Sequence, residues 1–281
     1  MDRITQKGMT SPPARVMPRL SVALAFVAMI PSAARTAAQQ TVLLRFAPPV
    51  GQVTRYRAVT QTWMQLPGLN VADTSQPAMS QTIYWTRTII DEQSNSWTAN
   101  TVIDSSSVGS MSGGDKVRGT VIRQTYDATG RLDSSSVTPP PGADSLIIAG
   151  LRLSGHVLGS LPSNLSMPSR PIRVGDSWGD TVSVPLTSPR GNITLKGRVI
   201  VTLEHLESVA GDRVVVISTV GDFVTDTSSV AAAGKASVRS TVRLDLDAGR
   251  MLSAISDQST ELMTPIGLVR ARMHSETVLL P

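Results

Sequence analysis

The segment "VRSTVRLDL", residues 238–246, decides the fold class of this chain, because its apolar and polar residues alternate. One phase holds Val238, Val242, Leu244 and Leu246, and the other holds Arg239, Thr241, Arg243 and Asp245. Successive residues of a strand point to opposite faces, so this pattern predicts a strand with one dry and one wet face. Such two-faced strands are typical of antiparallel sheets, whereas parallel sheets are covered on both sides.

Two longer segments show the same alternation. Residues 193–205 place His205 on the apolar phase, and residues 267–280 place His274 on the charged phase. Short Asp/Gly turns such as "DATGR" (127–131) and "DAGR" (247–250) predict hairpins. Further strands are predicted at residues 41–47, 52–65, 80–91, 95–104, 116–126, 131–137, 180–186, 213–220 and 250–262. The expected fold class is mainly β, with a curved antiparallel sheet or an open barrel.

One helix is expected near residues 143–161, after the breaker "TPPPG". Ile147, Leu151 and Leu158 recur at helical spacing, and the glycines of this segment would let its backbone approach the sheet closely. A strand over residues 146–153 is the alternative. Residues 39–281 are then a single β-rich domain, or two similar halves, 41–137 and 170–281, joined by a helical connector.

The first 38 residues have the pattern of a secretory signal peptide. Arg15 and Arg19 precede the apolar run "LSVALAFVAMI" (20–30), and small residues follow up to Ala38. The run is too short for an ordinary transmembrane helix, so no membrane span is expected after cleavage. The sequence therefore predicts a secreted or periplasmic protein, whose true start is either Met1 or Met17.

Charge and residue types exclude several functions. The chain contains 26 basic and 21 acidic residues, but residues 1–38 hold five of the basic and one of the acidic ones, so the remainder is nearly neutral. Nucleic-acid binding loses its electrostatic support for that reason. The chain has no cysteine, and its three histidines show no metal-ligand spacing. No glycine-rich phosphate motif is present either, so no metal and no cofactor are expected.

The segment "VGDSWGD", residues 174–180, contains the G-x-S-x-G pattern of serine hydrolases around Ser177. A catalytic triad would need His205 or His274 as the base. A nucleophile elbow, however, joins a strand to a helix, and "DTVSVPL" after Ser177 alternates like a strand. The hydrolase therefore remains an alternative, and the favoured interpretation is a turn that starts a strand.

Most aromatic residues fall in the first half of the chain. Trp63, Trp85 and Trp97 are the predicted ligand-binding residues, lining an apolar concavity with Met64 and Met79 near its rim. Packing in a core with few aromatic residues is the alternative explanation.

The phrase "RVGDSW" with a later "D-x-G-R" hairpin, together with "LRFAPPVGQVTRYRAV" (44–59), resembles uncharacterised secreted bacterial β-proteins. That resemblance implies no site residues. At the level of architecture the chain is similar to periplasmic lipoprotein and lipid carriers, which implies a curved sheet around a hydrophobic cavity. The leading hypothesis is an exported, non-enzymatic protein that binds a lipid-like ligand or an envelope partner. A serine hydrolase and a structural envelope protein without a ligand are the alternatives.

Overall fold

The computed structural model describes residues 41–67, 76–93, 96–108, 114–143, 167–188, 191–225, 233–264 and 267–281. All of them belong to one compact unit, Ala38–Pro281, and residues Met1–Ala37 form a second unit. The predicted signal peptide and residues 144–161 of the predicted helix lie outside the described residues.

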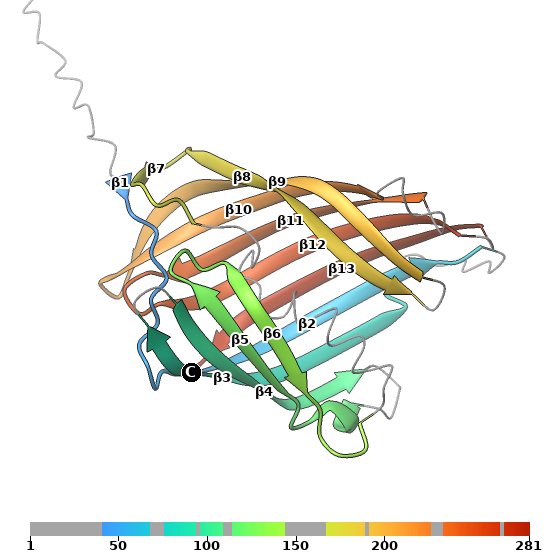
Figure 1. The fold of residues 1–281 in the computed structure, drawn as a ribbon, viewed down its shortest axis with the longest axis horizontal. Helices are drawn as coiled ribbons and strands as arrows, with labels where there is room; N and C mark the ends of the chain where they lie inside the picture. The colour runs from blue at the N-terminus through green and yellow to red at the C-terminus, as the bar shows by residue number, and fades with distance from the viewer. Residues whose placement is uncertain are drawn as a thin grey trace, which may run out of the picture. The chain divides into compact units, whose positions relative to one another are not determined.

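Eleven strands form one sheet in which every neighbouring pair is antiparallel (Figure 1). Their bounds are β2 Val53–Gln65, β3 Met79–Gln93, β4 Ser96–Val108, β5 Val121–Asp127, β6 Leu132–Thr138, β8 Ser177–Ser188, β9 Gly191–Val209, β10 Asp212–Thr225, β11 Ala233–Asp245, β12 Arg250–Thr264 and β13 Gly267–Leu280. The order across the sheet is β6-β5-β4-β3-β2-β13-β12-β11-β10-β9-β8. The edge strands β6 and β8 do not pair with each other, so the sheet stays open. The mainly β, antiparallel fold predicted from the alternation is confirmed.

The described residues contain no α-helix. Their one helical element is a short 3-10 helix, Gly114–Val117, whose last two residues overlap the segment 116–126 that was predicted to be a strand. The strand of that segment begins only at Val121, because Gly119 adopts a positive φ of 81° and turns the chain before it. The packed helix therefore has no support from the described part of the chain. Within the described residues, no helical segment is long and hydrophobic enough to cross a membrane.

Two meanders, β2–β6 and β8–β13, meet where β2 pairs with β13. The turns before the two meanders have the same hydrogen bonds. The Gly51 amide donates to the Ile89 carbonyl over 2.9 Å, and the Gly175 amide donates to the Leu203 carbonyl over 2.8 Å. Both glycines have a positive φ. The "DATGR" and "DAGR" hairpins each connect the fourth strand of a meander to the fifth. An internal duplication, which these likenesses favour, stays a prediction.

The core lies on one face of the sheet, which we call the core face and define by Tyr56, Trp85 and Leu203. A segment that continues from β1 (Thr41–Val42) packs on this face through Val42, Leu44 and Phe46. Only its first two residues form a strand, pairing with β7 (Ile172–Arg173), although residues 41–47 were predicted to be a strand throughout. Apolar and polar residues alternate in this segment because every second side chain fills the core. Beyond Val42 the segment has no hydrogen-bonded pairing with another strand.

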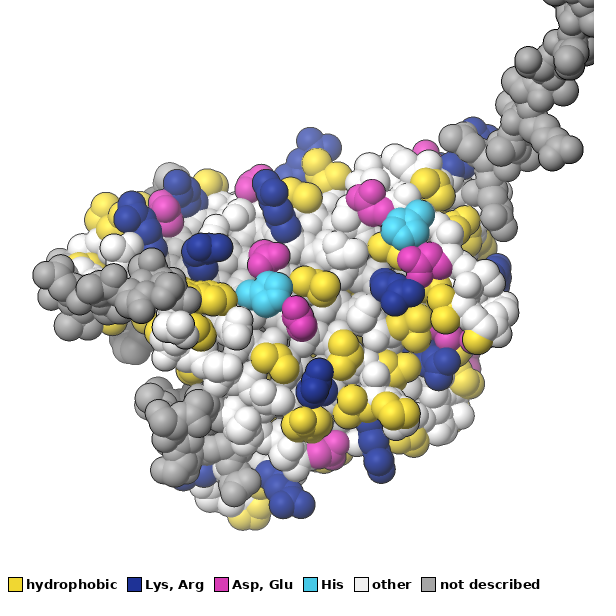
Figure 2. All heavy atoms as spheres, turned by 180° about the vertical axis from the view of Figure 1, so that it is seen from behind, with side chains coloured by type: hydrophobic (Ala, Val, Ile, Leu, Met, Phe, Trp, Pro, Cys, Tyr) yellow, Lys and Arg dark blue, Asp and Glu magenta, His cyan; other side chains and the backbone are white. Residues whose placement is uncertain are grey.

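The opposite face, the charged face, carries most ionisable side chains of the long strands. Figure 2 shows this face, with basic and acidic side chains spread over it and histidines beside acidic groups. Within β2 and β9–β13 its basic residues outnumber its acidic ones. The basic residues include Arg55, Arg57, Lys196, Arg198, Lys235, Arg239, Arg243, Arg270 and Arg272, and the acidic ones include Glu204, Glu207, Asp222, Asp257, Glu261 and Glu276.

Candidate functional site

Ser177 is the first residue of β8, an edge strand of the sheet. Its hydroxyl lies 2.9 Å from the hydroxyl of Thr202 on β9, and both belong to the charged face. A strand follows this serine, as the alternation predicted, and the helix that a nucleophile elbow requires does not. The structure therefore places Ser177 at an exposed strand start, bonded to a neutral side chain.

The two histidines that were candidates for a triad each bind carboxylates. The Nε2 atom of His205 lies 3.0 Å from Glu207, and the Nδ1 atom of His274 lies 2.8 Å from Asp257. His274 is on β13, five strand spacings from Ser177, or about 24 Å measured along the sheet. Among the described residues neither histidine hydrogen bonds to Ser177.

The prediction that His205 lies on the apolar phase of its strand is wrong. The pairing of β9 with β10 shifts between Val216 and Ile217, so that Glu204 is an extra residue in β9. A bulge of one residue reverses the phase of everything after it. His205 consequently pairs with Val216 on the charged face, and its side chain is 54% exposed.

Asp245 was likewise expected on the wet phase, but it is 1% exposed. Its carboxylate accepts hydrogen bonds from the Ala248 amide over 2.9 Å and from Nε of Arg250 over 3.1 Å. The hairpin folds back over the carboxylate and satisfies it locally, which is why burial is tolerated.

The three tryptophans predicted to bind a ligand do not lie together. Trp85 is buried against Tyr56, with ring centroids 5.6 Å apart. Trp97 belongs to another cluster, where it stacks on Tyr126 at 4.1 Å. Trp63 lies on the charged face, because it pairs with Arg272. Trp85 and Trp97 thus face the side on which an apolar ligand was predicted, and Trp63 faces away from it.

The side chain of Arg87 lies over the stacked rings of Trp97 and Tyr126. The Arg87 guanidinium carbon lies 5.0 Å from the Trp97 ring centroid and 5.3 Å from that of Tyr126. This distance is typical of a cation–π interaction. Burial raises the pKa of Tyr126, while the charge of Arg87 and its hydrogen bond act in the opposite direction.

A large part of the core face carries no Asp, Glu, Lys, Arg or His. This uncharged area comprises every second residue of Thr54–Met64 in β2, Leu195–Leu203 in β9, Val215–Thr225 in β10, Gly234–Leu244 in β11, Ala254–Leu262 in β12 and Val269–Leu279 in β13. Its side chains at one end belong to the buried core. Those toward the β12–β13 turn, such as Val238, Thr260 and Met273, are only half-buried. The area therefore continues the core as an apolar and hydroxyl-bearing surface.

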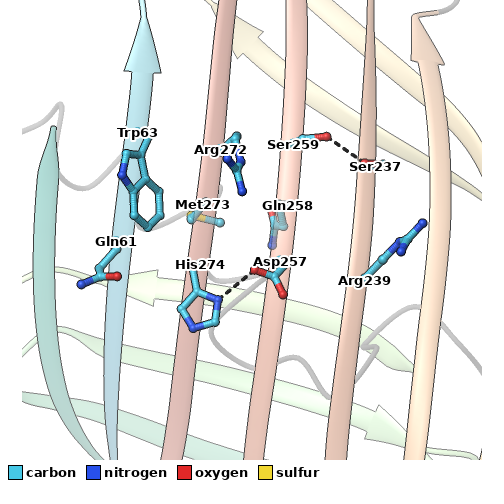
Figure 3. Close-up of a pocket in the computed structure, with 10 residues that line it drawn as sticks. All are labelled: Gln61, Trp63, Ser237, Arg239, Asp257, Gln258, Ser259, Arg272, Met273 and His274. Atoms are coloured by element: carbon cyan, nitrogen blue, oxygen red, sulfur yellow. Dashed lines mark hydrogen bonds and ion pairs between the residues drawn. The ribbon is translucent and has the colours of Figure 1, made fainter. Parts of the chain in front are cut away.

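The charged face holds a cavity of about 400 Å³ across β2, β13, β12 and β11. Figure 3 shows Arg272 and Arg239 on either side of the stretch of β12 formed by Asp257, Gln258 and Ser259. Gln61, Trp63, Ser237 and His274 complete its lining on this face, and Met273 also borders it, although the register places Met273 and Gln258 in the phase of the core face. The alternation of the sequence placed these residues on individual strands but gave no signal for which strands are neighbours, and so the cavity was missed.

His274 forms hydrogen bonds with two carboxylates at this cavity. Its bond to Asp257, and a weaker contribution from its 3.2 Å bond to Glu276, raise the pKa of His274 above the usual value for histidine. In the described part of the chain no group of three or more His, Cys, Asp or Glu side chains is arranged to hold a metal ion.

Comparison with known proteins adds little to this geometry. No family model matches the chain, and no curated protein does. A structure described as "Lipid-protein interactions in lipovitellin" is similar over 84% of this chain with 14% identity and a TM-score of 0.43, and the chain spans only 25% of that protein. Another, described as "Asymmetric conductivity of engineered proteins", is similar over 82% of this chain and 99% of its own, with 8% identity and a TM-score of 0.25. At these values neither likeness bears on function.

Proposed function

We propose that this chain is an exported, non-enzymatic protein that holds an apolar, lipid-like ligand against the uncharged area of its core face. The observation that carries the proposal is the separation of charge between the two faces. Over the ranges that define the uncharged area, the strands place Arg, Lys, Asp and Glu on one face and none of them on the other. Export rests on the signal-peptide pattern of residues 1–38.

A surface without ionised groups suits an alkyl chain because an unpaired charge beside hydrocarbon is costly. Val238, Leu262 and Met273 provide apolar contact, and the hydroxyl groups among them leave room between larger side chains. Burial contributes about 0.8 kcal/mol for each methylene group, so ten methylene groups contribute about 8 kcal/mol before the cost of ordering. A net contribution of about 8 kcal/mol would correspond to a dissociation constant of about 1 μM, so after the cost of ordering we expect ten buried methylene groups to give binding weaker than this.

Adjacent residues of β11 provide a matched test, since Ser240 points to the core face and Thr241 to the charged face. We expect the purified protein to bind a fluorescent long-chain fatty acyl probe in a titration. Ser240→Lys should weaken that binding at least tenfold, because it places an ammonium group in the uncharged area. Thr241→Lys adds the same charge on the exposed face and should leave binding within twofold.

Thr260→Lys on β12 repeats the test where the core face is half-buried, in case Ser240→Lys does not fold. Circular dichroism and thermal unfolding identify variants that remain folded. Absence of probe binding by the unaltered protein, or equal weakening by the charges on both faces, would contradict the proposal and leave the envelope-partner or structural role.

A further inference from the structure

The cavity on the charged face contains two cations without partners. Arg239 and Arg272 both line it, and within the described residues neither guanidinium group forms a hydrogen bond or an ion pair. Other basic groups nearby are neutralised: Lys235 and Arg270 both pair with Glu261, at 3.1 and 3.4 Å. Two guanidinium groups are thus available to a ligand in this cavity, while Glu261 is already engaged by the two neighbouring basic groups.

The register places these two arginines at opposite corners of a small patch. Arg272 pairs with Ser259, and Arg239 pairs with Asp257, so the arginines lie two strands apart, or about 10 Å in the pairing direction. Side chains of their length can converge over β12 between them. Beside them the hydroxyls of Ser237 and Ser259 are hydrogen bonded to each other over 2.8 Å, so that one of the two donates to the other and the second can donate to a ligand oxygen.

Asp257, the one carboxylate in the lining, is already hydrogen bonded to His274. Protonated His274 would offset the negative charge of Asp257. The net charge of the cavity is then positive because of Arg239 and Arg272. Trp63 beside Arg272 presents a flat apolar surface at one end of the cavity. A volume of about 400 Å³ is in the range of small-molecule sites, so more than a bare ion can enter.

We propose that this cavity is a second binding site, which takes a phosphomonoester through Arg239, Arg272 and the one hydroxyl donor that the Ser237–Ser259 pair leaves available. Guanidinium groups bind phosphate oxygens by paired, charge-assisted hydrogen bonds, which is the chemistry available here. The group attached to the phosphate lies toward Trp63. The site is on the opposite face from the proposed lipid-binding area and does not depend on it.

The phosphomonoester can be a free metabolite or a lipid headgroup, and two probes distinguish these sources. Calorimetric titration with glucose 6-phosphate tests the first. Sedimentation with phosphatidylcholine vesicles containing phosphatidic acid, compared with phosphatidylcholine alone, tests the second. Binding of either probe, together with its weakening in the variants below, supports the proposal and names the source.

The decisive variant is Arg239→Gln with Arg272→Gln, matched by Arg55→Gln with Arg198→Gln, which removes two basic groups of the same face outside the cavity. The first pair should weaken binding at least tenfold, and the second should leave it within twofold. Each single variant should lose several-fold, since each removes one guanidinium. Failure of both probes to bind, or equal weakening by both pairs, would show that the cavity is no such site.

Discussion

Gly249 is a residue whose backbone and surroundings both exclude a side chain. It has a φ of 60°, and an added Cβ would lie 2.7 Å from the backbone of Pro48. Gly211 has a φ of 97° but no atom within 4 Å of that position. We expect Gly249→Ala to lower the free energy of unfolding by about 2–4 kcal/mol, and Gly211→Ala by about 1 kcal/mol, because only the first adds a clash to the backbone strain. Urea denaturation measures both, and equal losses would contradict the contact with Pro48.

His274 gives the stability of the protein a dependence on pH. Because its hydrogen bonds with Asp257 and Glu276 raise its pKa in the folded state, its contribution is complete below the unfolded pKa. That contribution is lost as the pH rises through the raised folded pKa. His274→Gln should therefore destabilise the protein by about 0.5 kcal/mol at pH 5.5 and by less at pH 9, a small effect because the pair is largely solvated. Urea titrations at the two pH values measure this, and an equal loss at both would contradict it.

At the scale of elements, the segment after β1 is held by side chains instead of a ladder. Phe46 is 2% exposed, and its ring centroid lies 5.6 Å from that of Trp97. Phe46→Ala should lower the free energy of unfolding by about 3–4 kcal/mol, since a large buried side chain is removed. The exposed neighbour Arg45 is the control, and Arg45→Ala should change stability by less than about 0.5 kcal/mol. Guanidinium denaturation measures the free energy of unfolding of both variants. A small effect of Phe46→Ala would show that the segment does not stabilise the fold.

The elements also show what could be predicted from the sequence. Alternation located the long strands to within a few residues, as for β2, predicted at 52–65 and found at 53–65. It failed at His205 because a bulge of one residue cannot be seen in the pattern that it interrupts. It also failed at residues 43–47, where burial alternates without strand pairing.

For the candidate site the limit was different. The alternation shows which residues of one strand share a face. Which residues of two different strands lie on the same face of the sheet depends on the pairing of distant segments, such as β2 with β13. Trp63 and Trp85 lie on opposite faces because the register of β2 with β3 pairs Trp85 with Tyr56, and Trp63 is in the opposite phase of β2. The cavity that joins Trp63, Arg239 and Arg272 exists only through the pairing of β2 with β13.

At the scale of the whole molecule, the sheet separates two chemistries. Its core face continues from a buried core into an uncharged area, and its charged face carries a basic surplus and a polar cavity. A ligand of each kind would meet a different face of the same strands. The identity of the face in contact with an apolar chain is therefore the central claim of the account.

Photolabelling tests this claim most directly. A fatty acid with a diazirine near the end of its alkyl chain is bound to the purified protein, irradiated, and the labelled residues are identified by mass spectrometry. The account predicts labels at core-face residues of β11–β13, such as Val238, Thr260 and Ala271, and none at Thr241 or Ile255 on the charged face. Labels confined to the charged face, or spread equally over both faces, would contradict it.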